Sequence, residues 1–549
     1  MSTGAGQRRA TEGTRMSERD QHADQQGRAS SSGPRAEDAA RISAGYASDG
    51  EALRLGAVML DGQVYGEAPI RIPLAMMNRH GLIAGATGTG KTRTLQLLAE
   101  QLSDAGVPVF AADIKSDLSG LAQAGASNAK IAERTAQVRD DWTPTTYPVE
   151  FFSLGGDKTQ GSPLRATVTS FGPLLLSKVL GLNETQESSL QLMFHWADTN
   201  GLPLLDLKDL RSVITFLTSA EGKSQLEGIG GVSKATAGVI LRQLSALATS
   251  GAEEFFGEPE FDTRDLLQTR GTQGVISLIE LVKVQNRPEL FSTFLMWLLA
   301  DLYNDLPEVG DTDKPKLVFF FDEAHLLFNG ASKAFLQQVT QTVRLIRSKG
   351  VGVFFVTQQP TDVPDDVLAQ LGNRVQHALR AFTPDDAAAL AKTVKTYPKT
   401  EDYDLAHDLT QLGTGEAVVT VMSERGAPTP VAWTRLPAPR SSMAPADPAL
   451  FSQLVTDSTF MSKYGEEVDR DSAYERLAAR TQGTGEDGEQ APKPTSKASA
   501  DRKSAPKREP KPEPSAVERF FENGAVKQFM RSAAAAIARN IFGTARRRR

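Results

Sequence analysis

The stretch Gly81-Leu-Ile-Ala-Gly85-Ala-Thr-Gly-Thr-Gly90-Lys91-Thr92 decides the fold class of this chain. Its second part satisfies the pattern G-x-x-x-x-G-K-[ST], whose glycines let backbone N–H groups turn inward around phosphates. A short apolar strand from Gly81 to Ala84 precedes the pattern, and a helical segment from Lys91 to about Leu102 follows it. Because strand and helix are both in place, the pattern predicts a nucleotide site rather than a chance glycine-rich turn.

The residues of this loop have separate expected roles. Lys91 reaches the β and γ phosphates, and the Thr92 hydroxyl takes a position on Mg2+. The start of the helix adds partial positive charge to the loop. We therefore expect the nucleotide to be bound by Gly85, Ala86, Thr87, Gly88, Thr89, Gly90, Lys91 and Thr92.

A second stretch supplies acidic groups, Leu317-Val-Phe-Phe-Phe-Asp322-Glu323-Ala-His325. Five apolar residues predict a buried strand, and its carboxyl end brings two carboxylates to the sheet edge where open α/β folds bind ligands. We expect Asp322 to hold Mg2+ through water, and Glu323 to accept a proton from, or orient, the attacking water. Two acids at a strand end can also cap the next helix, but the phosphate loop favours the catalytic interpretation.

Further candidates follow the later strands. Gln358 lies two residues beyond the predicted strand Val351 to Val356, where an amide can sense the γ phosphate; a simple turn is the alternative. Phosphoryl transfer also gains from a guanidinium, often supplied by a neighbouring subunit. We expect Arg374 or Arg380 to have this role, with a surface ion pair as the alternative for each.

Strand and helix patterns divide the chain into segments. Short, wholly apolar strands alternate with helical segments, which predicts an α/β core with a mainly parallel sheet covered on both faces. One stretch between them is almost wholly helical in its apolar spacing. The expected segments are a disordered arm (1–50), a small β element (51–78), the core (79–162 and 268–437), a helical insertion (163–267), a partly disordered linker (438–514) and a cationic amphipathic helix (515–549).

Composition excludes several classes of protein. The 549 residues include 61 Lys and Arg against 67 Asp and Glu, a net charge of -6 that excludes a histone-like polycation. A hydrophobic content of 40% excludes a wholly disordered chain. Cysteine is absent, which excludes disulfides, thiolate zinc sites and a cysteine nucleophile. With no apolar run of membrane-spanning length and no signal peptide, we expect a cytoplasmic protein.

The last 35 residues differ from the rest. Residues 515–549 carry eight basic residues against two acidic ones, and their apolar residues fall near helical spacing. Four interpretations stay open for this predicted helix: self-association, an anchor on anionic lipid, a grip on DNA phosphates, or packing against its own domain.

Several motifs in this order resemble the HerA/FtsK superfamily of P-loop motor ATPases, and most closely the HerA-like bacterial subfamily. The resemblance extends over about Leu53 to Leu436. The motifs that carry it are Asn78–Thr92, Ala112–Gly120, Phe321–His325 and Arg344–Gly352 running into Val356–Pro360.

The resemblance implies a RecA-like P-loop NTPase fold, ATP with Mg2+ as cofactors, and a homo-oligomeric ring, hexameric in the better-known members, that moves along double-stranded DNA. HerA proper also has an N-terminal β-barrel, for which only about Leu53 to Asn78 is present here. The alternative is a nucleotide-gated assembly ATPase whose C-terminal helix binds a membrane surface or a protein partner. Carried over by position, the family's roles fall on Lys91 and Thr92 (phosphate loop), Asp322 and Glu323 (Mg2+ and catalytic acids), Gln358 (sensor) and Arg374 or Arg380 (trans arginine).

Overall fold

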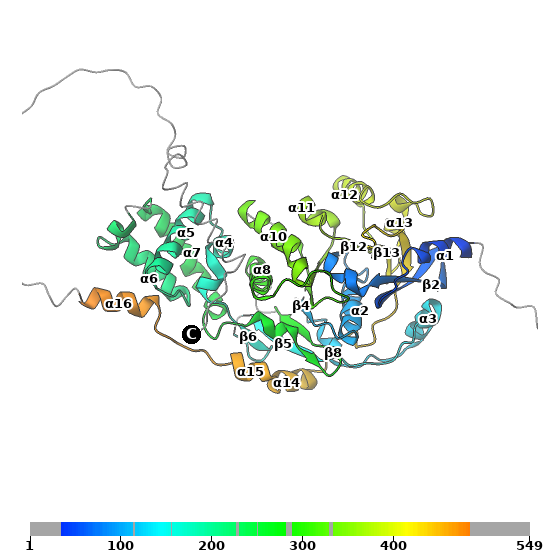
Figure 1. The fold of residues 1–549 in the computed structure, drawn as a ribbon, viewed down its shortest axis with the longest axis horizontal. Coiled ribbons are helices and arrows are strands. Elements are labelled where there is room, and N and C mark those ends of the chain that lie inside the picture. Colours follow the sequence, from blue (N-terminus) through cyan, green and yellow to red (C-terminus); the bar gives the residue numbers. More distant parts are fainter. Residues whose placement is uncertain are drawn as a thin grey trace, which may run out of the picture.

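The computed structural model describes residues 35–113, 116–154, 156–226, 230–249, 251–281, 288–328 and 333–483. Figure 1 shows two regions along its longest axis, a sheet with flanking helices and a group of helices beside it. The predicted helix at 515–549 lies outside the described residues, as do residues 1–34 of the predicted arm.

A twelve-stranded sheet forms the core of the described chain, in the order β2-β1-β14-β13-β12-β3-β11-β10-β4-β9-β5-β6. The parallel strands are β12 (Asn373–Gln376), β3 (Gly81–Ala84), β11 (Val351–Thr357), β10 (Leu317–Phe321), β4 (Val109–Asp113), β9 (Ile276–Glu280), β5 (Val149–Leu154) and β6 (Ser162–Leu164). The antiparallel extension contains β13 (Glu416–Thr420), β14 (Ala432–Arg435), β1 (Ala52–Leu60) and β2 (Gln63–Pro73). A separate hairpin pairs β7 (Thr269–Arg270) with β8 (Gln273–Gly274). The mainly parallel sheet is as predicted.

The sheet is buried on both faces. Successive strand residues point to opposite sides, and a hydrophobic cluster covers each side. Phe319 and Phe321 of β10 belong to the hydrophobic cluster that also includes the insertion helices. Val318 and Phe320 belong to the opposite cluster, which includes the apolar side of α2 (Lys91–Asp104). A continuous run of apolar residues in β10 therefore contributes side chains to the hydrophobic cores on both faces of the sheet.

The helical insertion lies beside the sheet (Figure 1), and its helices begin with side-chain caps. Asn183 and Gln186 form a reciprocal capping box at the start of one helix, and Asp206 and Asp209 form another. These helices are α4 (Val168–Val179), α5 (Glu184–Thr199), α6 (Leu207–Thr218) and α7 (Lys234–Thr249).

Order begins earlier than the composition predicted. Helix α1 (Ala36–Ala44) lies inside the stretch expected to be a disordered arm up to residue 50. Its Ala39 and Ile42 are buried, and the buried Tyr46 hydroxyl donates to the carbonyl of Val419 at 2.8 Å. This corrects the prediction for residues 35–50: a few apolar side chains on one face suffice when the sheet edge supplies the rest of the core.

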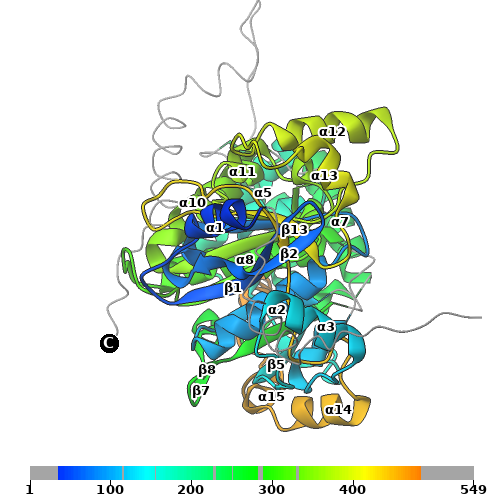
Figure 2. The same ribbon diagram turned by 90° about the vertical axis from the view of Figure 1, so that its right-hand side faces the viewer.

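A C-terminal strap, residues 437–483, replaces most of what was expected to be a linker. It contains α14 (Pro448–Thr456), α15 (Thr459–Tyr464) and α16 (Ala473–Gly483), and it runs from the core to the insertion (Figure 1). Seen from the side, α14 lies next to β5 and α15 next to β6, on the opposite side of the molecule from α12 and α13 (Figure 2).

Acidic side chains hold the strap along its length, which is why its polar composition does not prevent folding. The carboxylate of Glu100 accepts from the backbone N–H of Arg440 at 2.8 Å, and that of Glu150 from the hydroxyl of Ser458 at 2.7 Å. At the insertion, Asp209 accepts from the N–H of Tyr474 at 2.9 Å.

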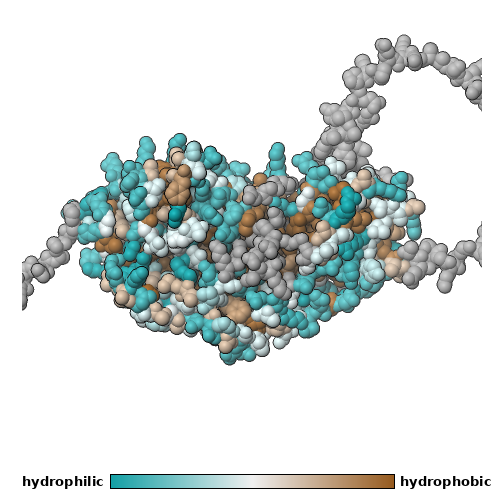
Figure 3. All heavy atoms as spheres, turned by 180° about the vertical axis from the view of Figure 1, so that it is seen from behind, coloured by the Kyte–Doolittle hydropathy of each residue, from teal (hydrophilic) through white to brown (hydrophobic). Residues whose placement is uncertain are grey.

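Other helices cover the sheet and its connections. They are α3 (Ala129–Val138), α8 (Pro288–Asp305), α9 (His325–Phe328), α10 (Lys333–Ile346), α11 (Asp365–Leu368), α12 (Pro384–Val394) and α13 (Leu405–Gln411). Within the described ranges, every helix is too short or too polar to cross a bilayer. Hydrophilic residues predominate on the face seen in Figure 3, and hydrophobic ones gather in separate patches.

Candidate active site

The phosphate loop, residues 85–92, joins β3 to α2 and is tethered on both sides. The N–H of Gly85 donates to the carbonyl of Thr357 at the end of β11 (3.2 Å). The N–H of Ala86 donates to the carbonyl of Ala378, just beyond β12 (2.8 Å). Both flanking strands therefore fix the position of the loop.

The glycines of this loop are required by close neighbours and by backbone conformation. A Cβ at Gly85 would lie 2.5 Å from the Cβ of His377, and one at Gly90 would lie 3.3 Å from the backbone nitrogen of Gly415. Gly88 has a φ of +79°, a left-handed conformation that favours glycine, and it faces open space. The loop is thus tightly packed at Gly85 and Gly90, and it is open to solvent at Gly88.

Side chains of the loop fit a phosphate cradle. The ammonium group of Lys91 donates to the carbonyls of Gly85 (2.7 Å) and Ala86 (3.2 Å), so it lies against the loop. The hydroxyl of Thr89 donates to the carbonyl of Ala86 at 2.7 Å, which stiffens the turn from within. Thr92 is in the first turn of α2, where the helix terminus also favours an anion.

The acidic pair reaches the same edge of the sheet. Strand β11 lies between β3 and β10, and its Phe355 pairs with Phe321 on one side and Leu82 on the other. Asp322 and Glu323 therefore continue β10 at the level where β3 runs into the phosphate loop. Two strand spacings separate these backbones, about 10 Å. A nucleotide phosphate with one metal ion fits a gap of that size.

Glu323 adopts an unusual backbone conformation. Its φ is +49°, a region that residues other than glycine rarely occupy. Its N–H donates to Oδ1 of Asp322 at 2.9 Å, and its Oε2 lies 3.4 Å from Nδ1 of His325. The following N–H, of Ala324, donates to the carbonyl of Val356 in β11 (2.9 Å). The turn thus directs two consecutive carboxylates out of one strand end.

Gln358 directly follows β11, between the phosphate loop and the acidic pair. Its side chain is exposed. The turn is fixed on both sides of it, because the hydroxyl of Thr357 and the N–H of Gln359 both donate to Oδ2 of Asp362, at 2.7 and 2.9 Å. The backbone position suits the predicted sensor role, which stays a prediction.

The two candidate arginines lie at different places. Arg374, within β12, donates to the hydroxyl of Thr396 (2.8 Å) and to the carbonyl of Leu368 (3.5 Å). Arg380 follows β12, is exposed, and lines a pocket beside the phosphate loop of its own chain. Action on a neighbouring subunit stays a prediction for both.

Sequence reasoning missed a group that supports the phosphate loop from behind. The guanidinium of Arg134, on α3, donates to the carbonyls of Gly415 and Leu436 at 3.0 Å each. Gly415 in turn donates its N–H to the carbonyl of Thr89 at 3.2 Å. The carboxylate of Glu416 holds the same turn through Arg435 at 2.7 Å. Arg134 lies 281 positions from Gly415 and 302 from Leu436, so no local pattern signals its role.

His377 was also missed. It is fully buried behind the phosphate loop, and its Nε2 lies 2.8 Å from the hydroxyl of Thr94 in α2. Burial lowers the pKa of His377 to about 4, and the charge of Lys91 acts in the same direction. His377 is therefore a neutral packing group at physiological pH.

A second acidic pair, Asp113 and Glu280, ends the neighbouring strands β4 and β9 and was not predicted as a pair. The two residues are direct register partners, and both are buried. The carboxylate of Asp113 accepts from the N–H of Leu118 (2.7 Å), and that of Glu280 from the hydroxyl of Ser116 (2.5 Å). Burial, and next the charge of Asp113, raise the pKa of Glu280 to about 8.

This raised pKa predicts a pH-dependent stability. Between about pH 4.5 and 8 the unfolded chain carries a charged Glu280 and the folded chain a neutral one, so rising pH favours unfolding. Glu280→Gln is expected to increase the free energy of unfolding at pH 8.5 by about 1 to 3 kcal/mol, with little change at pH 5. Urea unfolding at both pH values tests this, with the exposed Glu401→Gln as control. Equal gains at both pH values would contradict the assignment.

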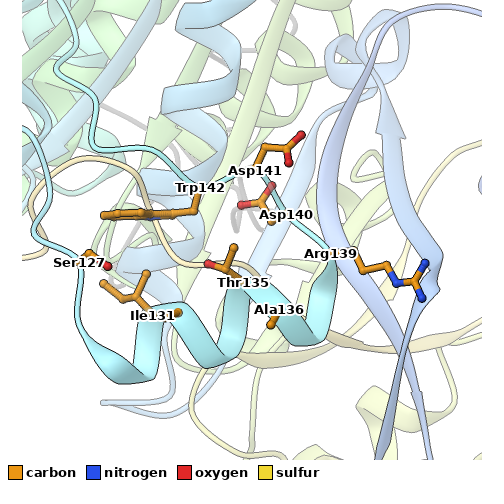
Figure 4. Close-up of a pocket in the computed structure, with 9 residues that line it drawn as sticks. Ser127, Ile131, Thr135, Ala136, Arg139, Asp140, Asp141 and Trp142 are labelled. Carbon is orange, nitrogen blue, oxygen red and sulfur yellow. The ribbon is translucent and has the colours of Figure 1, made fainter.

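A second hollow, of about 530 Å³, lies against α3 (Figure 4). The ring of Trp142 lies across from Ile131 and Thr135, and its Nε1 donates to the carbonyl of Pro439 at 2.7 Å. Arg139 points away from the hollow and pairs with Glu67 of β2 at 2.6 Å. The hollow is thus bounded by contacts that join α3 to the strap and to the N-terminal hairpin.

Comparison with known proteins identifies the family. The sequence model of the family described as helicase HerA-like C-terminal matches residues 59–549. The chain belongs to this family. This HerA-like chain is also similar to a probable helicase of Methanocaldococcus jannaschii, with 27% identity over 154 residues. That match covers 26% of this chain and only 28% of the relative.

Two solved structures are similar to this HerA-like chain. The plasmid coupling protein TrwB in complex with ADP and Mg2+ has a TM-score of 0.50 and 15% identity, and the match covers 74% of this chain and 93% of that one. VirB4 of Thermoanaerobacter pseudethanolicus has a TM-score of 0.46 and 14% identity, over 71% and 98% of the two chains. The fold is that of a RecA-like P-loop NTPase, as the sequence resemblance implied.

Proposed function

We propose that this HerA-like protein hydrolyses ATP with Mg2+ and couples the reaction to movement along, or remodelling of, duplex DNA in an oligomeric ring. One observation carries the proposal: the phosphate loop and the acidic pair reach the same carboxyl edge of a single sheet, with only β11 between them. This edge is where open α/β folds place ligands and catalytic groups.

The residues divide the chemistry among them. Backbone N–H groups of the phosphate loop and the ammonium of Lys91 bind the β and γ phosphates. Thr92 and Asp322 hold Mg2+, which neutralises phosphate charge when it is bound and needs only one or two protein ligands. Glu323 accepts the proton of the attacking water, and Gln358 orients that water.

DNA as the track is supported by family membership and by the name of the archaeal relative, a probable helicase. The chain has a net charge of -6, so nonspecific attraction to DNA does not come from the whole surface. Basic side chains gathered inside the pore of a ring would allow DNA binding by a chain with a net negative charge, because they face only the duplex.

Duplex DNA is expected to raise the steady-state ATPase rate of the full chain at low salt. Because phosphate contacts release counterions, the half-stimulating DNA concentration should rise about 10- to 1,000-fold between 50 and 200 mM salt. The measurement is ATP turnover against DNA concentration at both salt concentrations. An ATPase rate that duplex DNA leaves unchanged at 50 mM salt would contradict the motor proposal and leave hydrolysis standing.

The second candidate is a nucleotide-gated assembly ATPase, favoured by the eight basic residues and the apolar spacing of 515–549. Deleting these residues discriminates between the two functions. Loss of binding to vesicles that contain phosphatidylserine, with DNA-independent ATPase retained, favours assembly at a membrane. Retention of DNA stimulation in the deletion variant favours the motor.

A further inference from the structure

A pocket of about 480 Å³ lies on the side of the phosphate loop opposite the acidic pair. The loop residues Gly88 and Thr89 form one wall of this pocket, and the chain just beyond β12 forms another. The third wall comes from the end of α13, with Gln411, and from the turn that follows it, with Thr414. The pocket is therefore continuous with the phosphate cradle.

One side chain in this pocket differs from every other large hydrophobic residue of the described chain. Phe382 is 81% exposed, whereas the next most exposed, Tyr474, is 49% exposed. Phe382 comes directly after His377-Ala-Leu-Arg380-Ala in the sequence. The first residue of this segment is held against β3, because the N–H of His377 donates to the carbonyl of Ala84 (2.7 Å). The segment between β12 and α12 thus carries an exposed aromatic ring next to the phosphate loop.

The order of strands sets the direction in which a nucleotide must lie. β12 and β11 flank β3 on opposite sides, and the acidic pair lies beyond β11. If the γ phosphate faces Glu323, the nucleoside end of the molecule extends toward β12 and its pocket. A purine or pyrimidine ring has two aromatic faces, and stacking on a phenyl ring is favourable and tolerant of base identity.

We propose that Phe382 is the stacking platform for the base of the nucleotide bound by the phosphate loop. The inference rests on the proposed function for the existence of that nucleotide and adds the residue that holds its base. The exposed Arg380 lines the same pocket and adds positive charge on the ribose–phosphate side. The polar wall of Gln411 and Thr414 gives the edge of the base hydrogen-bonding groups.

Because the base would stack on an exposed ring and would not be enclosed in a buried pocket, the site is expected to discriminate weakly among bases. An aromatic face contributes affinity to any base, whereas strict discrimination requires hydrogen bonds to buried base edges. Gln411 and Thr414 are both exposed, so water competes for their polar groups. The site therefore binds nucleoside triphosphates with weak preference among bases and depends on the ring of Phe382 for affinity.

The test uses the full chain and measures ATP affinity by calorimetry, which does not depend on hydrolysis. Phe382→Ala is expected to raise the Kd of ATP about tenfold. Phe382→Tyr should keep the affinity within about twofold of the wild type, because the aromatic face is retained. Tyr474→Ala, an exposed aromatic residue on α16, is the matched control and should leave the Kd unchanged.

Inorganic tripolyphosphate provides the second arm, since it has phosphates and no base. Its Kd should be the same for the wild type and for Phe382→Ala; an equal loss for both ligands would mean a damaged pocket and overturn the proposal. An unchanged Kd of ATP in Phe382→Ala would also overturn the proposal. If sedimentation then showed that Phe382→Ala weakens subunit association, Phe382 would be a subunit contact instead of a base platform. A wild type that binds no ATP removes the proposed function itself, which is a separate and distinguishable result.

Discussion

Replacing Glu323 by glutamine is expected to lower ATP turnover by about 100- to 10,000-fold while ATP still binds. The amide has the shape of the carboxylate and cannot accept the proton of the attacking water. The strand end that positions residue 323 is held by Val356 of β11 through the N–H of Ala324, so the substitution leaves the turn intact. Turnover and ATP affinity are measured on the same preparation.

The control for this variant is Glu133→Gln, an exposed glutamate on α3. It should hydrolyse ATP at the wild-type rate. A Glu323→Gln protein that retains more than about a tenth of wild-type turnover would remove Glu323 from the role of general base. The carboxylate would then serve the turn, through its contact with His325, rather than the chemistry.

Replacing Lys91 by alanine is expected to lower kcat/KM for ATP by about 100- to 1,000-fold, since one charged donor to the phosphates is lost. The substitution also removes the two hydrogen bonds from the ammonium to the carbonyls of Gly85 and Ala86. Those bonds are partly exposed, so the free energy of unfolding should change little. ATPase kinetics and thermal unfolding, measured together, separate the two effects.

Lys395→Ala, at the exposed end of α12, is the control for charge loss at the surface and should retain wild-type kinetics. A Lys91→Ala protein with a much reduced melting temperature would point to a structural role of the loop contacts. One with wild-type kcat/KM would mean that the phosphate loop does not bind the substrate, and the proposed function would fail with it.

The phosphate loop and the acidic pair could be predicted because each is a short run whose meaning is local. The glycines, lysine and threonine of residues 85–92 lie on one turn between a strand and a helix, and Asp322 and Glu323 end an apolar strand. The preference of parallel strands for one orientation then brings both runs to the same edge. The shared edge could be predicted although Lys91 and Asp322 are 231 positions apart, because each motif by itself marks the carboxyl end of a strand.

The strap and α1 could not be predicted from composition. Residues 437–483 contain few large apolar side chains in a row, and their position depends on carboxylates that belong to other segments, such as Glu100 and Asp209. Hydrogen bonds of this kind lie between residues more than 250 positions apart. A sequence window detects an apolar period, and it contains no information on such partners.

By itself, the sequence determined the family, the phosphate loop and the pair of acids that ends a second strand, because these depend on residue types at fixed local spacing. Only the tertiary structure decided which residues lie behind and beside the loop: Arg134 through Gly415, His377 against Gly85, and the exposed ring of Phe382. The physical reason is that support and base recognition come from side chains whose neighbours are set by sheet order and not by chain order.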